Sequence, residues 1–154
     1  MAILLRGCTQ TNTDRPCTAA GCQPARKKLY KEGGSYGFLV EHEGKRYLIR
    51  PSCNFIPGQL DGIKADVLFL AVAGLAKDDT EHKRQFWAET IEKVKPGLVI
   101  PLHWDNFFTP LYGPIVSLPR LFEFTGTSLH ELAAACAERD VPCTVQLPLT
   151  SVVL

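Results

Sequence analysis

Residues 95–107 constrain the fold of this chain more than any other segment, because they read as a helix end, a buried strand and a polar exit. Pro96 and Gly97 end the helix, and Leu98–Leu102 is a short apolar run of the kind found in strands covered on both faces. His103 follows directly. Because ligands of open α/β sheets commonly bind at the carboxyl ends of strands, His103 is the first candidate for a functional residue. The alternative is a structural imidazole bonded to loop carbonyl groups.

Length and composition fit one globular domain. The chain has 154 residues, of which 45% are hydrophobic and 21% are charged, and this is enough apolar material to bury a core. The net charge of +1 is a poor match to the basic surface of a nucleic-acid binder, and the basic run at residues 26–28 is more simply a solvated patch. No apolar run reaches the roughly 18 residues that span a bilayer, and residues 2–5 are too few for a secretory signal. We therefore expect a soluble, cytoplasmic protein that binds neither nucleic acid nor membrane.

The cysteines are expected to be free thiols. Six are present and no two of them form a Cys-x-x-Cys pair, which argues against a zinc ribbon or a thioredoxin-like redox motif. Six cysteines would suit the disulfide framework of a small secreted domain, but without an export signal free thiols are favoured. Three of them, Cys8, Cys17 and Cys22, lie near the amino terminus, where a metal or redox site is the less favoured alternative.

The first predicted elements are strands. Residues 1–30 show no clear period and read as an irregular or poorly ordered arm, and the packed domain is expected at residues 31–154. Strands at residues 36–41 and 46–50 form a hairpin, and a buried strand follows at residues 66–72.

Two helices are expected to pack on this sheet. The first follows the polar stretch at residues 77–80 and runs to about Val94. The second is predicted from the capping box formed by Ser128 and Glu131, and a last strand is predicted at residues 143–147. Alternation of strands and helices in this order indicates an α/β fold.

The loop at residues 104–112 is rich in aromatic side chains, namely Trp104, Phe107, Phe108 and Tyr112. These rings would suit the wall of a pocket or a binding surface. The simpler alternative is that they cover the edge of the sheet.

Four stretches of the chain follow a pattern known from one enzyme superfamily. They lie at residues 32–39, 48–58, 65–70 together with 74–75, and 99–105, and the last, Val-Ile-Pro-Leu-His-Trp-Asp, is the most specific. In these stretches the chain resembles the carboxyl-terminal half of the metallo-β-lactamase superfamily of metal-dependent hydrolases. The resemblance implies a metallo-β-lactamase-like αββα sandwich, represented mainly by its carboxyl-terminal half, a sheet with two main helices. It also implies that His103 is a metal ligand and that zinc is the cofactor.

The chain departs from the superfamily at two positions of its metal site. The motif His-x-His-x-Asp-His is absent, because the chain has only His42, His82, His103 and His130, which are not clustered. Apart from His103, these histidines are expected to be solvated. At the position of the metal-bridging Asp the chain has Ser52, and a neutral hydroxyl is a far poorer ligand for a divalent cation than a carboxylate.

A catalytic zinc needs three protein ligands and an open position for water. Near His103 the sequence offers Asp105, Ser52 and Cys53 at neighbouring strand ends, and also Asp78 or Asp79 after the third strand. A site of His103, Asp105 and Cys53 is conceivable. Cys53 is equally explained as a small buried residue, and Asp105 as a loop cap or as a carboxylate that orients His103.

Three functions fit these observations. The first is a metal-dependent hydrolase of a small-molecule ester, amide or phosphoester that obtains further ligands from elsewhere. The second, which the incomplete ligand set favours, is a truncated or oligomeric remnant without catalysis. The third is an interaction module that uses the aromatic loop at residues 104–112. Half of a sandwich also exposes an apolar sheet face, so we expect either a homodimer or an amino-terminal half supplied by another chain.

Overall fold

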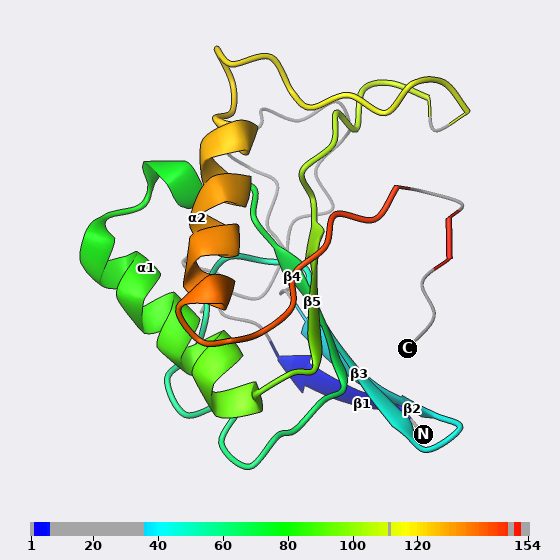
Figure 1. Cartoon of the computed structure of the whole chain (residues 1–154), viewed down its shortest axis with the longest axis vertical. Coiled ribbons are helices and arrows are strands. Elements are labelled where there is room, and N and C mark those ends of the chain that lie inside the picture. Colours follow the sequence, from blue (N-terminus) through cyan, green and yellow to red (C-terminus); the bar gives the residue numbers. More distant parts are fainter. Residues whose placement is uncertain (1, 7–35, 111, 148–149, 152–154) are drawn as a thin grey trace, which may run out of the picture.

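Five strands form one mixed sheet in the computed structural model, in the order β1-β2-β3-β4-β5 (Figure 1). The structure describes residues 2–6, 36–110, 112–147 and 150–151. The strands are β1 (Ala2–Arg6), β2 (Tyr36–His42), β3 (Lys45–Arg50), β4 (Val67–Ala71) and β5 (Leu98–Leu102). Strands β1 to β3 pair antiparallel, and β3, β4 and β5 pair parallel. The predicted α/β class is confirmed.

The hairpin between β2 and β3 closes with two residues. Glu43 and Gly44 both have positive φ, at 48° and 76°. A positive φ at both central positions is what a type I′ turn requires, and its twist matches that of the flanking strands. His42, at the end of β2, is 73% exposed, as predicted.

The helices lie together on one side of the sheet in Figure 1. They are the short helix η2 (Leu75–Lys77), helix α1 (Thr80–Trp87) with its continuation η3 (Ala88–Glu92), and helix α2 (Thr125–Ala137). The Asp79 carboxylate caps α1 by accepting the backbone N–H of His82 at 2.8 Å, so the predicted polar start of this helix is confirmed. No helix in the described part of the chain is long and apolar enough to cross a membrane.

A row of four aliphatic side chains crosses the sheet on the helix side. Leu39, Leu48, Leu68 and Val99 stand opposite one another on β2 to β5, and each is fully buried. The helices contribute the other half of this core through Phe86, Ile91, Val94, Leu132 and Cys136. Complete burial of a side chain of this size stabilises the fold by about 1.5–3 kcal/mol.

The opposite face of the sheet carries a second row, Phe38, Ile49, Phe69 and Ile100. Its exposure changes along the row. Phe38 is 41% exposed, whereas Ile100 is 4% exposed, because the carboxyl-terminal segment packs over β4 and β5. The apolar face expected from half of a sandwich is therefore open at the β2 end and covered at the β5 end.

Two predicted elements differ from the structure. Residues 2–6 fall in the arm predicted to be irregular but form β1, because this apolar run extends the sheet along β2. The rest of that arm, including its three cysteines and the basic run, lies outside the described residues. The strand predicted at residues 143–147 is reduced to one parallel bridge between Cys143 and Val99. The chain then turns away, and Gln146 lines a pocket instead.

The capping box predicted at Ser128 is wrong. Helix α2 begins at Thr125, and its cap residue Phe124 provides no side-chain bond. The Ser128 hydroxyl is buried and accepts the backbone N–H of Ala76 at 3.1 Å, and Glu131 pairs with Lys83 at 2.9 Å. Both side chains therefore join α2 to neighbouring elements rather than cap it.

Candidate functional site

A pocket of about 290 Å³ lies at the carboxyl end of β5, on the face of the sheet opposite the helices. Its apolar floor comes from the sheet, and its rim includes His103, Trp104 and Asp105. The remaining wall comes from the loop after β5 and the carboxyl-terminal segment, through Ile115, Gln146, Leu147 and Thr150. Two residues singled out from the sequence, His103 and Asp105, therefore line the same pocket.

His103 has an uncommon backbone conformation. Its φ is 57°, in the left-handed region, which costs an L-residue roughly 1–2 kcal/mol. The side chain is exposed, and its ring lies 6.0 Å from that of Phe107. Within the described residues no hydrogen bond engages the imidazole, so the alternative of an imidazole held by loop carbonyl groups finds no support there. Strain of this kind is often found where a side chain is held for function.

Asp105 is half-buried at the same rim. In the described part of the chain its carboxylate accepts no hydrogen bond from the loop, so the capping interpretation is not observed. The pocket thus offers one imidazole and one carboxylate above an apolar floor.

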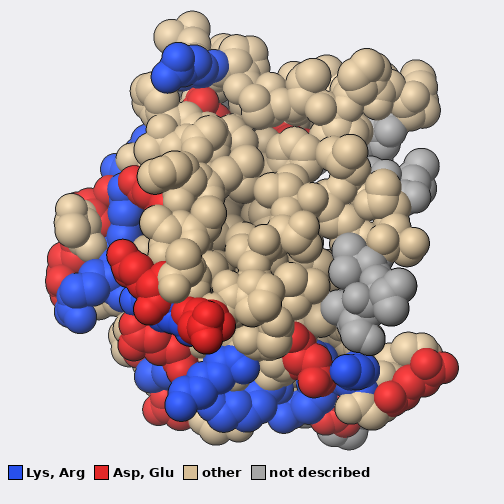
Figure 2. Space-filling model, viewed as in Figure 1, with Lys and Arg blue, Asp and Glu red and all other residues tan. Residues whose placement is uncertain are grey.

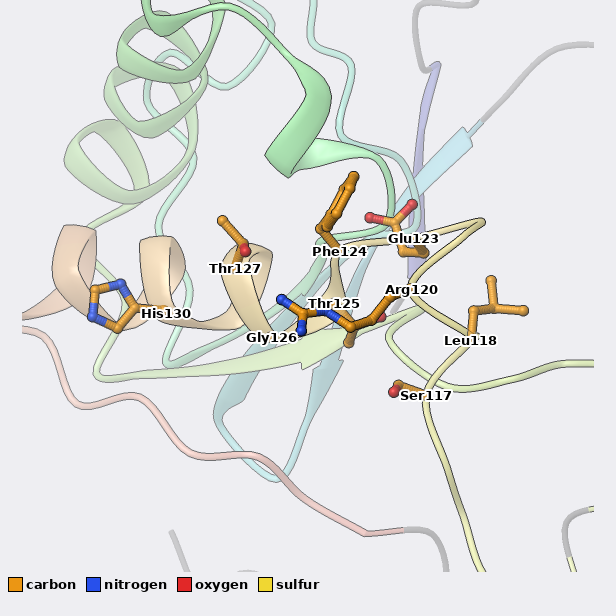
Figure 3. Close-up of a pocket in the computed structure, with 9 residues that line it drawn as sticks. All are labelled: Ser117, Leu118, Arg120, Glu123, Phe124, Thr125, Gly126, Thr127 and His130. Carbon is orange, nitrogen blue, oxygen red and sulfur yellow. The ribbon is translucent and has the colours of Figure 1, made fainter.

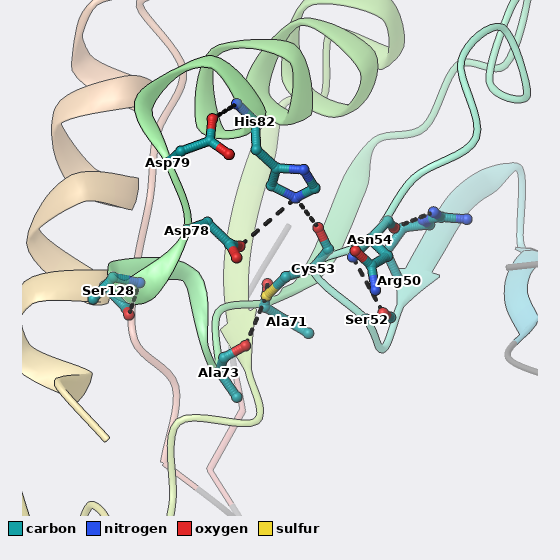
Figure 4. A network of polar contacts seen from close by, with 11 residues as sticks. Arg50, Ser52, Cys53, Asn54, Ala71, Ala73, Asp78, Asp79, His82 and Ser128 are labelled. Atoms are coloured by element: carbon teal, nitrogen blue, oxygen red, sulfur yellow. Dashed lines mark hydrogen bonds and ion pairs between the residues drawn. The ribbon is translucent and has the colours of Figure 1, made fainter. Parts of the chain in front are cut away.

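The hydroxyl of Ser52 has a local structural role. Its Oγ accepts the backbone N–H of Asn54 at 3.2 Å, a bond across two residues that stabilises the turn after β3 (Figure 4). Ser52 does not line the pocket beside His103.

Cys53 belongs to the loop after β3, and its side chain lies against the carboxyl end of β4. Its Sγ is 3.1 Å from the carbonyl oxygens of both Ala71 and Ala73, to which the thiol can donate (Figure 4). Burial, with the charges of Asp78 and Glu123, raises the pKa of the Cys53 thiol from 9.0 to about 12. The thiol is therefore protonated at neutral pH in the folded chain.

The prediction that His82 is solvated is wrong. Its side chain is 25% exposed, and its ring stacks 6.5 Å from that of Phe86 with 8° between the planes. The Nε2 atom lies 3.3 Å from the carbonyl oxygen of Cys53 and 3.6 Å from the carboxylate of Asp78 (Figure 4). A spacing of four residues places His82 on the same side of α1 as Phe86 and near Asp78, and this was the signal that could have identified it.

The described residues do not assemble a zinc site. No three His, Cys, Asp or Glu side chains in the described part of the chain are grouped to hold a metal ion. His103 and Asp105 line one pocket, while Cys53 packs beside α1. Since a catalytic zinc needs three protein ligands, these residues alone do not fit it.

No protein-family model matches the chain, and a search of curated proteins found no match. The fold and the pocket define an α/β domain in which the imidazole of His103 and the carboxylate of Asp105 lie at the carboxyl end of β5. The resemblance to metallo-β-lactamase-type hydrolases stays a prediction.

Proposed function

We propose that this protein is a metallo-β-lactamase-type hydrolase homologue with an incomplete metal site, built on the carboxyl-terminal half of the αββα sandwich. Its role in this proposal is to bind a small molecule beside His103. The half-sandwich is supported by a mixed sheet with its helices on one face and by a second, apolar face that is open at β2.

The observation that carries the proposal is the pocket shared by His103 and Asp105. Its volume of about 290 Å³ is at the small end of ligand pockets, which combine apolar walls with a few polar groups. The floor of Phe69, Ile100 and Leu102 would hold an apolar group. An amide on that group could accept a hydrogen bond from the imidazole and donate one to the carboxylate.

Zinc binding would require ligands from outside this pocket. If a second copy or a separate amino-terminal half supplied further ligands, His103 and Asp105 would hold the metal with them, and bound zinc would lower the pKa of a water molecule. The described residues do not complete such a site, so the proposal rests on binding.

Titration with phenylacetamide, an aromatic amide of suitable size, tests the proposal. Trp104 lines the pocket, so its fluorescence should change saturably. His103→Ala and Asp105→Asn should each weaken binding about fivefold to tenfold, the cost of one lost hydrogen bond. The matched control is His42→Ala, which removes an exposed imidazole from the hairpin. Equal affinities in all four proteins would contradict the proposal.

A second candidate function, an interaction module, rests on the aromatic loop. Phe107, Phe108 and Tyr112 are 59%, 79% and 93% exposed, so the alternative in which these rings cover the sheet edge is wrong for them. Figure 2 shows charged side chains gathered over the lower and left parts of the molecule, while few lie over the loop segment at the top. Contiguous exposed apolar surface usually marks a docking site.

We propose a second copy of this chain as the partner of that loop. Light scattering should then give the mass of a dimer for the natural chain and of one chain for a Phe108→Ser, Tyr112→Ser variant. Since both side chains are exposed, the variant should stay folded by circular dichroism. A single-chain mass for the natural protein would contradict this candidate.

A further inference from the structure

A second cavity, of about 480 Å³, opens at the start of helix α2 (Figure 3). It shares no lining residue with the pocket beside His103. Most of the residues that line it have polar side chains, and they come from the segment before α2 and from the first two turns of that helix. The inference drawn from it does not depend on the proposed function.

The amino terminus of α2 is uncapped. The cap position is Phe124, which offers no side-chain acceptor, and the first turn contains no acidic residue. In the described part of the chain the backbone N–H groups of Thr125, Gly126 and Thr127 have no acceptor. Free N–H groups and the positive end of the helix dipole together favour an anion at this place.

A cation lies at the same place. Arg120 lines the cavity, and Figure 3 shows its side chain extending toward the first turn of α2. Its guanidinium group forms no ion pair within the described residues. Arg120 and the helix terminus are two positive groups at one cavity, which favours an anion between them, and a guanidinium suits a phosphate in particular.

Two buried oxygen atoms in the wall of the cavity also have no partner. Thr125 is 6% exposed and Glu123 is 8% exposed, and neither Thr125 Oγ1 nor Glu123 Oε1 has a hydrogen bond. Buried polar atoms are nearly always paired, so orphan atoms point to a missing ligand. The threonine hydroxyl can donate to a phosphate oxygen, and the carboxylate can only accept.

Glu123 makes the site selective. It is the acidic residue among those that line the cavity, and its other oxygen, Oε2, lies 3.8 Å from Lys77 Nζ. Its charge opposes a bare anion, but its free Oε1 can accept a hydrogen bond from a hydroxyl group of the ligand. A ligand with a phosphate and a neighbouring hydroxyl would therefore offer a partner to both orphan oxygen atoms, Thr125 Oγ1 and Glu123 Oε1.

We propose that this cavity binds a phosphate monoester carried on a hydroxylated body, such as a sugar phosphate. The phosphate lies between the first turn of α2 and Arg120, with the Thr125 hydroxyl as a further donor. The hydroxylated part faces Glu123, beside the hydroxyl groups of Ser117 and Thr127 at the mouth.

Isothermal titration with ribose 5-phosphate and with inorganic phosphate tests this proposal. Ribose 5-phosphate should bind saturably and more tightly than inorganic phosphate. Arg120→Gln should weaken its binding about tenfold, as loss of a charge-assisted hydrogen bond does. Thr125→Val, which keeps the shape of the side chain, should weaken it less. Lys45→Gln in the hairpin is the control for loss of a surface charge and should change nothing.

NMR spectra test where the ligand binds. In ¹H–¹⁵N spectra of the natural chain, the amide signal of Gly126 should shift with ribose 5-phosphate, whereas that of Gly44 in the hairpin should not. The proposal would be overturned if binding of ribose 5-phosphate did not saturate. It would also be overturned if Arg120→Gln and Lys45→Gln weakened that binding equally. Equal affinity for inorganic phosphate would overturn the role given to Glu123. Because Arg120 is exposed, its replacement should leave the fold intact.

Discussion

His82 Nε2 lies 3.3 Å from the carbonyl oxygen of Cys53, and this contact joins helix α1 to the loop that follows β3. The ring also packs against Phe55 and Phe86, at 5.2 and 6.5 Å from their rings, which are 6.3 Å from each other. One imidazole thus links a helix, a loop and the aromatic part of the core.

Replacing His82 with alanine should therefore destabilise the fold. The variant loses a part-buried hydrogen bond and leaves a gap beside Phe55 and Phe86, which we expect to lower the free energy of unfolding by about 2–3 kcal/mol. Urea denaturation followed by circular dichroism measures this. His42→Ala is the control, since that side chain is 73% exposed, and it should change stability by less than about 0.5 kcal/mol.

The thiol of Cys53 should make stability depend on pH in the alkaline range. Its pKa rises from 9.0 to about 12 in the folded chain, so the folded state keeps a proton that the unfolded state loses above pH 9.0. The contribution of this thiol is therefore complete below pH 9.0 and is lost as the pH rises toward about 12. The expected slope is about 1.4 kcal/mol per pH unit.

A Cys53→Ala variant isolates this effect from lysine and tyrosine titration. The difference in unfolding free energy between the natural chain and the variant should be constant from neutral pH to pH 9.0 and should shrink above it. The measurement should extend to about pH 11, which is roughly one unit below the pKa of the folded thiol. If the difference in unfolding free energy stays constant up to that pH, the thiol is not held protonated in the folded chain.

Leu68 lies at the centre of the buried row, opposite Leu48 and Val99. Because it is fully buried, Leu68→Ala should cost about 2–5 kcal/mol through lost burial and the cavity left behind. Leu121→Ala removes the same atoms from a side chain that is 88% exposed and should cost less than about 0.5 kcal/mol. Equal losses in thermal or urea unfolding would contradict the assignment of the core.

The central strands and the position of the pocket beside His103 could be predicted from the sequence. Leu98–Leu102 is apolar throughout because β5 is covered by helices on one face and by the carboxyl-terminal segment on the other. Such a run identifies a strand, and the first polar residue after it lies at the edge of the sheet. His103 and Asp105 could be placed there without knowledge of the rest of the fold.

Other features depend on contacts between distant parts of the chain. Ser128 has the spacing of a helix cap, but its hydroxyl is taken by the backbone of Ala76, 52 residues away. His82 looks solvated among charged neighbours until the loop at Cys53 packs against it. The strand at residues 2–6 needs β2 as a partner, because a short apolar run alone does not determine pairing.

The zinc content of the purified protein shows whether the metal site at His103 is incomplete. Metal analysis by mass spectrometry, with the natural chain and His103→Ala expressed and purified in the same zinc-supplemented buffers, should give substoichiometric zinc in both. One equivalent of zinc or more in the natural chain, lost in His103→Ala and retained in His42→Ala, would mean that the metal site at His103 is complete.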